Sequence, residues 1–246
     1  MKKAIIIEKR LGISPDYQYK QLRSNNFLYA NWHNNKLVVL DYILNLTKAT
    51  DVLDLGTGSG NFELKFAKRL NKIVGIDYND EAIGFLKSKL RENKINNVKL
   101  IVSDLREIEK INNLPRFDLI IMVDVIEHLK IKDAQKLVIK LQSMLKKGGK
   151  ICIITPNYKS TWLILERMLD VFTILPHMEG EQHLAKYSRQ DLESLFTKAG
   201  FKPVYFNSFN LFSFVFFNKS IAKTLCELEM ALKLPFGNLI VSLFQN

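Results

Sequence analysis

A glycine-rich turn in the first third of the chain carries residue types suited to binding a small ligand. Residues 52–62 read VLDLGTGSGNF, so an apolar run that contains Asp54 leads into glycines at 56, 58 and 60. Glycines let backbone N–H groups approach a ligand closely, because no side chain stands in the way. The acid would repel a pyrophosphate, and Asn61 stands where the dinucleotide fingerprint needs its third glycine. The turn therefore favours a positively charged ligand.

This turn resembles the D/E-x-G-x-G-x-G motif of class I S-adenosylmethionine-dependent methyltransferases. Asp54, Gly56, Gly58 and Gly60 fill every specified position of that motif, and Thr57 lies within it. S-adenosyl-L-methionine carries an α-ammonium and a sulfonium, so an acid at the strand end attracts it. The resemblance therefore implies that these five residues bind S-adenosyl-L-methionine as the cofactor.

Two further acids follow strands that come next along the chain. Asp77 ends the apolar run that begins at Lys72, at the place where such folds bind ribose hydroxyls. Asp104 follows a third apolar run, and in the family an acid there bonds the adenine amine. A single acid at a strand end is more often a helix cap or a turn residue, but three acids in register with three strands favour a binding site. The neighbours that complete the predicted cofactor set are Tyr78, Ser103 and Leu105.

The end of the fourth predicted strand carries a cluster that could act on the methyl acceptor. Its sequence is Asp124-Val-Ile-Glu127-His128, and ligands of doubly wound sheets bind outside the carboxyl ends of the strands. We expect Asp124 to serve the cofactor or the chemistry, and His128 to act as a base. His183 is a second catalytic candidate, because the loop that holds it can fold over the same crevice. The structural alternatives are a capped helix start for Glu127-His128 and loop bracing for His183.

The same cluster also resembles a metal site. Asp124-x-x-Glu127-His128 with the distant His183 is similar to the E-x-x-E-H and His site of small-RNA 2′-O-methyltransferases, except that aspartate replaces the first glutamate. The Glu-His pair also occurs in quinone-ring O-methyltransferases. Two acids and two imidazoles could hold a divalent cation that polarises a hydroxyl. A divalent metal is therefore an alternative at these four residues.

Strand and helix patterns alternate along most of the chain, which predicts an α/β fold with a doubly wound, mostly parallel, seven-stranded sheet. Runs such as 119–123 are continuously apolar, as expected of strands that are buried on both faces. The resemblance implies an antiparallel final strand. We expect strands at 51–55, 72–77, 98–103, 117–123, 150–155, 201–209 and 238–244, and helices at 59–70, 79–93, 105–112, 133–147, 188–199 and 218–232.

The whole chain, 1–246, is predicted to be one methyltransferase domain with added helical elements. Residues 1–50 form a helical cover with an amphipathic run at 36–46, and residues 51–157 form the cofactor-binding core. Residues 158–187 and 206–236 are expected to be lid or substrate elements. The first of these contains an apolar helix over 158–175, and both are rich in aromatic and aliphatic residues, which favours an apolar acceptor.

Composition limits the partners and the location. The chain has a formal net charge of +11, but its lysines are spread over helices, so a nucleic-acid partner or peripheral contact with an anionic membrane is the minority expectation. Cys152 and Cys226 fall inside predicted elements and form neither a disulfide framework nor a metal pair. No apolar run reaches the roughly 18 residues of a transmembrane segment, and the first residues lack a signal-peptide pattern, so we expect a cytoplasmic protein.

The favoured function is methyl transfer from S-adenosylmethionine to an oxygen, or a nitrogen, of a small apolar, aromatic or lipid-like acceptor. Residues after the fourth strand lack the proline and aromatic platform of DNA-adenine and protein-glutamine methyltransferases, and neither cysteine sits in the turn that a cytosine C5 enzyme requires. Two alternatives remain: an RNA methyltransferase that a metal could assist at the 2′ oxygen, and a catalytically silent S-adenosylmethionine-binding module.

Removing the predicted cofactor acids should weaken cofactor binding. We expect Asp54→Ala and Asp77→Ala each to reduce S-adenosylmethionine affinity more than Asp80→Ala, whose side chain should face the following helix start. Isothermal titration calorimetry measures the three affinities. Equal losses in all three variants would contradict the assignment.

Overall fold

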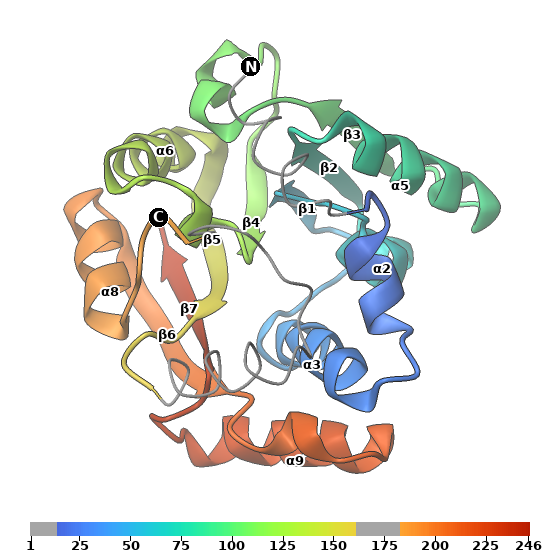
Figure 1. Ribbon diagram of the computed structural model, residues 1–246. Coiled ribbons are helices and arrows are strands. Elements are labelled where there is room, and N and C mark those ends of the chain that lie inside the picture. Colours follow the sequence, from blue (N-terminus) through green and yellow to red (C-terminus); the bar gives the residue numbers. More distant parts are fainter. Residues whose placement is uncertain (1–13, 161–182) are drawn as a thin grey trace.

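Seven strands form one sheet in the computed structural model, which describes residues 14–160 and 183–246 (Figure 1). Their order across the sheet is β3-β2-β1-β4-β5-β7-β6, and β7 runs antiparallel to both of its neighbours while the pairs from β3 to β5 are parallel. The predicted doubly wound, mostly parallel sheet is confirmed. The strands are β1 (Asp51–Leu55), β2 (Lys72–Asp77), β3 (Val98–Val102), β4 (Phe117–Val123), β5 (Leu145–Pro156), β6 (Lys202–Phe209) and β7 (Leu239–Gln245).

The central strands are buried on both faces, which explains their unbroken apolar sequences. In β4, Leu119 and Ile121 pack into the core on one side of the sheet, and Ile120 and Met122 pack into the core on the other. Successive side chains of a strand point to opposite faces, so four consecutive apolar residues require cover on both.

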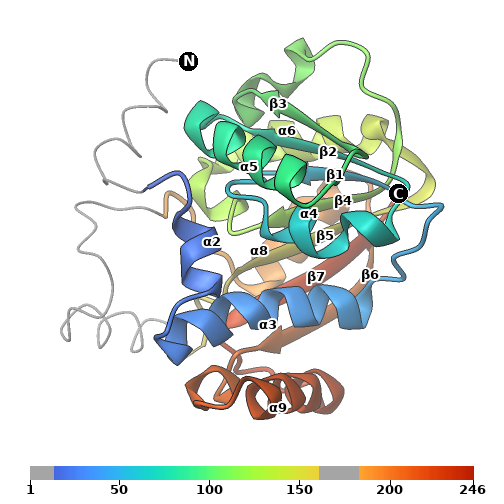
Figure 2. The same ribbon diagram turned by 90° about the vertical axis from the view of Figure 1, so that its right-hand side faces the viewer.

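Helices cover the two faces of the sheet (Figures 1 and 2). One face packs against α3 (Phe27–Ile43), α4 (Asn61–Phe66), α5 (Asp80–Glu92) and α9 (Lys219–Leu232). The other packs against α6 (Ile131–Met144), α8 (Arg189–Lys198) and the 3-10 helix η2 (Leu105–Lys110). The remaining short elements are α2 (Tyr17–Leu22), η1 (Ala67–Arg69), η3 (Ile126–His128) and η4 (Ser213–Val215). Among the helices in the described ranges, none combines the length and the apolar content needed to cross a bilayer.

In the described ranges, most predicted elements are found within two residues of their expected bounds, with α4 and η1 together forming the helix expected at 59–70, and three are not. The helix at the N-terminal cover begins at Phe27 rather than at 36, because the side chain of Asn26 accepts the amide of Leu28 and caps it there. The helix expected to run to 147 ends at Met144, and β5 begins at Leu145 instead of 150. Leu145 is buried and pairs with Phe117, so its packing against the sheet outweighs helix continuation.

The two segments predicted as lid elements are described only in part. Of 158–187, residues 161–182 lie outside the described ranges, including nearly all of the predicted apolar helix. The segment 206–236 begins within the outermost strand β6 and continues through η4 into α9, which packs against α3 and β6.

A buried glutamate of α9 organises the loop before that helix. The Glu229 carboxylate accepts the amides of Phe212 and Ser213, both at 2.9 Å, and the amide of Leu211 at 3.3 Å. The Ser213 hydroxyl donates to the same carboxylate at 3.0 Å. One acid therefore satisfies the backbone of a whole turn, whose amides would otherwise lack partners.

Truncating this glutamate should destabilise the fold. Glu229→Ala leaves several buried amides without an acceptor, and we expect the free energy of unfolding in urea to fall by roughly 2–3 kcal/mol. The matched control is Glu227→Ala on the same helix, where the carboxylate is partly exposed and lies 3.7 Å from Lys223. Its loss should cost under about 0.5 kcal/mol. Similar losses in the two variants would contradict the role of Glu229.

Candidate functional site

The glycine turn joins β1 to α4 and follows a path that only small residues permit. Gly56, Gly58 and Gly60 all have positive φ angles. A Cβ atom at Gly56 would come within 2.3 Å of the Val125 side chain, which belongs to the loop after β4. The turn therefore passes close beside the end of β4, and the first glycine makes that approach sterically feasible.

Asp77 fixes the position of this turn. Its carboxylate accepts the Gly58 amide at 2.8 Å and the Asn79 amide at 2.9 Å. The Gly56 amide also reaches across to β2, where it donates to the Ile76 carbonyl at 2.7 Å. The predicted ribose-binding acid thus lies beside the glycine turn, as the motif spacing predicts, with Tyr78 next in sequence.

A second acid, which was not predicted from the sequence, lies beside Asp54. Glu63, in the first turn of α4, is fully buried, and the Thr57 hydroxyl donates to its carboxylate. Burial, followed by the charge of Glu63, raises the pKa of Asp54 well above its ordinary value. Burial also raises the pKa of Glu63. The acid of the glycine motif is therefore one of a carboxyl pair and not an isolated charge.

A small cavity of about 50 Å³ lies where α3 faces the ends of β1 and β4. Lys36 of α3 is one of its lining residues; it is almost fully buried and forms an ion pair with Asp124. Burial alone would raise the pKa of Asp124, but the Lys36 ammonium holds that pKa below its ordinary value. Burial, together with the nearby Lys36, lowers the pKa of His33 to about 3, so this imidazole is neutral. The remaining lining residues are Gln18, Leu37, Leu40, Asp54, Gly56, Thr57, Asn61, Phe62 and Val123.

Helix α2 lies over the glycine turn, which is what the predicted N-terminal cover would require. The Tyr19 amide donates to the Ser59 hydroxyl at 2.8 Å, and the Asn61 side chain donates to the Gln18 carbonyl at 2.9 Å. A Cβ atom at Gly58 would come within 2.3 Å of the Gln18 side-chain oxygen. The cover and the turn are therefore in direct contact.

The residues after β3 occupy the neighbouring position at the same edge of the sheet. Asp104 caps η2 by accepting the Arg106 amide at 2.9 Å, and it also forms an ion pair with the Arg106 guanidinium. Burial would raise the pKa of Asp104, but Arg106 lowers it. The Ser103 amide donates to the Asp77 carbonyl at 2.9 Å, which links this segment to β2, and the Leu105 side chain is buried. The helix-cap alternative thus holds for Asp104 in the structure.

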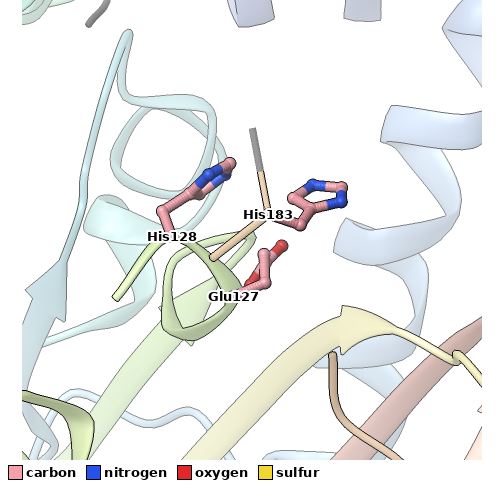
Figure 3. Close-up of side chains that lie close together, drawn as sticks. All are labelled: Glu127, His128 and His183. Atoms are coloured by element: carbon pink, nitrogen blue, oxygen red, sulfur yellow. The ribbon is translucent and has the colours of Figure 1, made fainter. Parts of the chain in front are cut away.

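Three of the four metal candidates converge after β4 (Figure 3). One ligand atom from each of Glu127, His128 and His183 lies within 4.8 Å of the other two. The imidazole rings of His128 and His183 are 5.2 Å apart between centroids, and the Tyr158 hydroxyl bonds Nδ1 of His183. Asp124 does not belong to this group, because it is turned toward Lys36.

Glu127 is the least satisfied member of the cluster. Its side chain is 1% exposed, and one carboxylate oxygen accepts the Thr155 hydroxyl at 2.9 Å. The other oxygen, Oε1, is buried without a hydrogen-bond partner among the described residues. Burial raises the pKa of Glu127 to about 7, although the adjacent His128 favours the ionised form. A buried carboxylate with an open acceptor position is suited to a ligand hydroxyl or a cation.

Family membership follows from comparison with known proteins. The methyltransferase domain family matches residues 46–203, well over half of the chain. The chain belongs to this methyltransferase family. The seven-stranded fold with its antiparallel β7 and the complete glycine motif agree with the class I, S-adenosylmethionine-dependent type.

Relatives of this methyltransferase act on different classes of acceptor. Magnesium protoporphyrin IX methyltransferase (ChlM) from Synechocystis PCC 6803, solved with bound SAH, has the same fold with a TM-score of 0.66 and 15% identity over 99% of each chain. (S)-Coclaurine N-methyltransferase from Papaver somniferum is 31% identical over 46% of this chain and 32% of its own length. The 23S rRNA (uracil(1939)-C(5))-methyltransferase RlmD from Legionella pneumophila is 31% identical over 41% of this chain. The methyltransferase spans 23% of the length of this rRNA relative.

The structure brings together the residues predicted from three strand ends and adds several that were missed. Glu63, Lys36 and His33 were not predicted. Lys36 and His33 lie three residues apart on a partly buried helix, and a charged or imidazole side chain on such a face is a usable signal. Glu63 resembles an ordinary first-turn acid of a helix in the sequence, so only its burial reveals it.

Replacing Glu63 by glutamine should change how stability depends on pH. Because the pKa values of Asp54 and Glu63 are raised in the folded chain, the unfolded chain loses these protons at lower pH. The stability linked to them is complete below the ordinary carboxyl pKa of about 4 and is lost as the pH rises through the raised values. Glu63→Gln should therefore lose less stability than the wild type as the pH rises above about 4 in urea titrations. Equal pH profiles would contradict the carboxyl pair.

Proposed function

We propose that this methyltransferase moves a methyl group from S-adenosylmethionine to an oxygen, or a nitrogen, of a small acceptor with an apolar or aromatic body. The observation that carries the proposal is the convergence of Glu127, His128 and His183 after β4, next to the loop that the glycine turn contacts. When bound, S-adenosylmethionine supplies an electrophilic methyl group on its sulfonium. The chain must then hold an acceptor atom in line and accept its proton.

The residues of the glycine-turn side fit the charges of the cofactor. Lys36 lines the cavity and would attract an α-carboxylate, while Asp54 and Asp124 would attract an α-ammonium. Asp77 ends β2 beside the turn, where ribose hydroxyls would meet its carboxylate. Asp104, Ser103 and Leu105 lie at the next strand end, on the adenine side of the proposed site.

The proposed acceptor would contact the imidazoles of His128 and His183 from the side opposite the cofactor. Burial, together with the nearby His128, lowers the pKa of His183 to about 4, so His183 is neutral at neutral pH and can take a proton. Its ring lies 5.9 Å from that of Tyr158 at an angle of 82°, an edge-on contact that fixes its orientation. We assign His183 and His128 as the groups that accept the acceptor proton.

Aromatic side chains near this cluster support an aromatic or apolar acceptor. The imidazole rings of His128 and His183 lie 5.2 Å apart between centroids. Tyr158 contributes a third ring beside His183. We propose that the N-terminal cover and the segments 158–187 and 206–236 enclose the acceptor.

Glu127, His128 and His183 would also suit a divalent cation. One carboxylate and two imidazoles are ligands that zinc, iron and manganese accept, and three protein ligands leave a position for the acceptor. A cation there would polarise an acceptor hydroxyl and lower its pKa. Oε1 of Glu127, which has no hydrogen-bond partner within residues 14–160 and 183–246, supports this assignment.

RNA methylation is the rival proposal. The net charge of +11 and the match to an rRNA methyltransferase favour it, although that match covers only part of each protein. Three hypotheses remain: methylation of a small acceptor, methylation of RNA, and a silent binding module. Assays of S-adenosylhomocysteine formation with a panel of phenols, quinols and amines, and with structured RNA, distinguish them. We expect turnover with a small acceptor; turnover with RNA alone would favour the rival, and no turnover with any acceptor would favour a silent binding module.

Substituting His183 should affect catalysis more than cofactor binding. We expect His183→Ala to lower kcat by roughly 100-fold, because a positioned base contributes about that much, while S-adenosylmethionine affinity stays within about twofold. The control is Arg189→Ala, an exposed residue at the start of α8. An unchanged rate in His183→Ala would return His183 to a loop-bracing role.

Chelation tests the cation. A cation held by these three residues predicts that dialysis against EDTA lowers the wild-type rate by at least about tenfold and that Mn²⁺ or Zn²⁺ restores it. Co²⁺ binding can be monitored by visible absorption. It should weaken in Glu127→Gln but not in Glu107→Gln on η2. If the wild type keeps its full methyl-transfer rate after chelation and does not bind Co²⁺, the cation is rejected. His128 and His183 would then remain as direct proton acceptors.

A further inference from the structure

The segment that contains η4 and α9 displays an unusual number of large apolar side chains. Its exposed fractions reach 52% for Phe212, 80% for Phe217, 47% for Ile221, 50% for Leu228, 59% for Leu232 and 62% for Phe236. We call these six residues the outer apolar surface. Single exposed apolar residues are ordinary, but a run of them along one segment usually marks an interaction site.

Helix α9 has two apolar sides, and only one of them belongs to the core. Ala222, Cys226 and Met230 are buried, and the helix packs against α3 and β6. Ile221 and Leu228, with Leu232 one turn further on, recur at the spacing that places residues on one side of a helix, and all three are exposed. Figures 1 and 2 both show α9 at the periphery of the described chain. The core therefore does not require the second apolar side.

The loop that carries Phe212 and Phe217 is held firmly from inside. In addition to the bonds to Glu229, the Asn31 side chain donates to the Phe214 carbonyl at 3.2 Å. The Phe214 ring meets Trp32 edge to face at 5.1 Å between centroids. A pinned turn that points phenylalanines outward fixes where those rings are presented.

Charge identifies the chemistry of the partner. Lys219 comes just before the exposed apolar residues of α9, and Lys233 comes just after them. Both lysines are exposed, and the whole chain carries a net charge of +11. Lysines beside exposed phenylalanines and leucines match an anionic bilayer surface, which offers both headgroup charge and an acyl boundary. A second copy of this basic chain would bring like charges together, and RNA would leave the apolar groups without a partner.

We propose that the outer apolar surface docks on anionic lipid bilayers. Its phenylalanines and leucines would lie in the bilayer interface, and Lys219 and Lys233 would contact the headgroups. The inference concerns the exposed side of the segment 206–236, whereas the enclosure of the acceptor proposed above involves its inner side. It extends the general expectation of membrane contact to one face of the molecule, remote in sequence from the glycine turn.

Vesicle co-sedimentation of the full chain tests the proposal. The probes are vesicles of phosphatidylcholine alone and of phosphatidylcholine with phosphatidylglycerol. The variant is Leu232→Ser/Phe236→Ser, and its control is Ile131→Ser/Ile139→Ser on α6, whose members are 59% and 62% exposed, matching the fractions at Leu232 and Phe236. We expect binding to the anionic vesicles that weakens with salt and falls at least about tenfold in the α9 variant only.

Several results would overturn the proposal. These are no binding to anionic vesicles at low salt, equal loss in the two serine pairs, or a dimer in light scattering that the α9 pair abolishes. Retention on RNA that the α9 pair removes would assign the surface to RNA instead. If circular dichroism shows that the Leu232→Ser/Phe236→Ser variant does not fold, the variant Lys219→Glu/Lys233→Glu provides the test. Unchanged binding of that variant to anionic vesicles would reject docking through this surface. S-adenosylhomocysteine formation is not a readout here, so failure of this proposal and of the reaction can be told apart.

Discussion

The hydrogen bond from the Gly58 amide to the Asp77 carboxylate joins the first two strands at the edge where ligands of this fold bind. It is possible because β1 and β2 are parallel and in register, with Leu55 opposite Ile76, so that both strands end at the same level. The position of the turn then determines where α2 can dock, through Ser59. Both α2 and the loop after β4 are thus positioned by contacts with this one turn.

Two carboxyl groups near the end of β4 have opposite surroundings although only two residues separate them. The Lys36 ammonium lowers the pKa of Asp124, whereas burial raises the pKa of Glu127 even though that carboxylate accepts the Thr155 hydroxyl. The strand end thus offers a fixed negative charge on one side and a group that can exchange a proton, or take a cation, on the other.

The sheet could be predicted from sequence because its strands are uninterrupted apolar runs, as in 119–123, and because acids at 54, 77 and 104 lie at or just after the ends of successive strands. The convergence of Glu127 and His128 with His183 was also anticipated, but the pairing of Asp124 with Lys36 was not. Lys36 lies 88 residues before Asp124 in the chain, and only the packing of α3 brings them together. The sequence can mark Lys36 as a charged residue on an apolar helix face, but it does not identify a partner that only the docking of that helix brings near.

Strand β7 lies between β5 and β6, although it follows both of them along the chain. During synthesis, β6 and its aromatic residues therefore emerge from the ribosome before the strand to which they pair. Until residues 239–245 are available, β5 and β6 both present open edges, which are sites for pairing with other chains. The two strands are thus held apart by a gap that only the last strand of the sheet can fill.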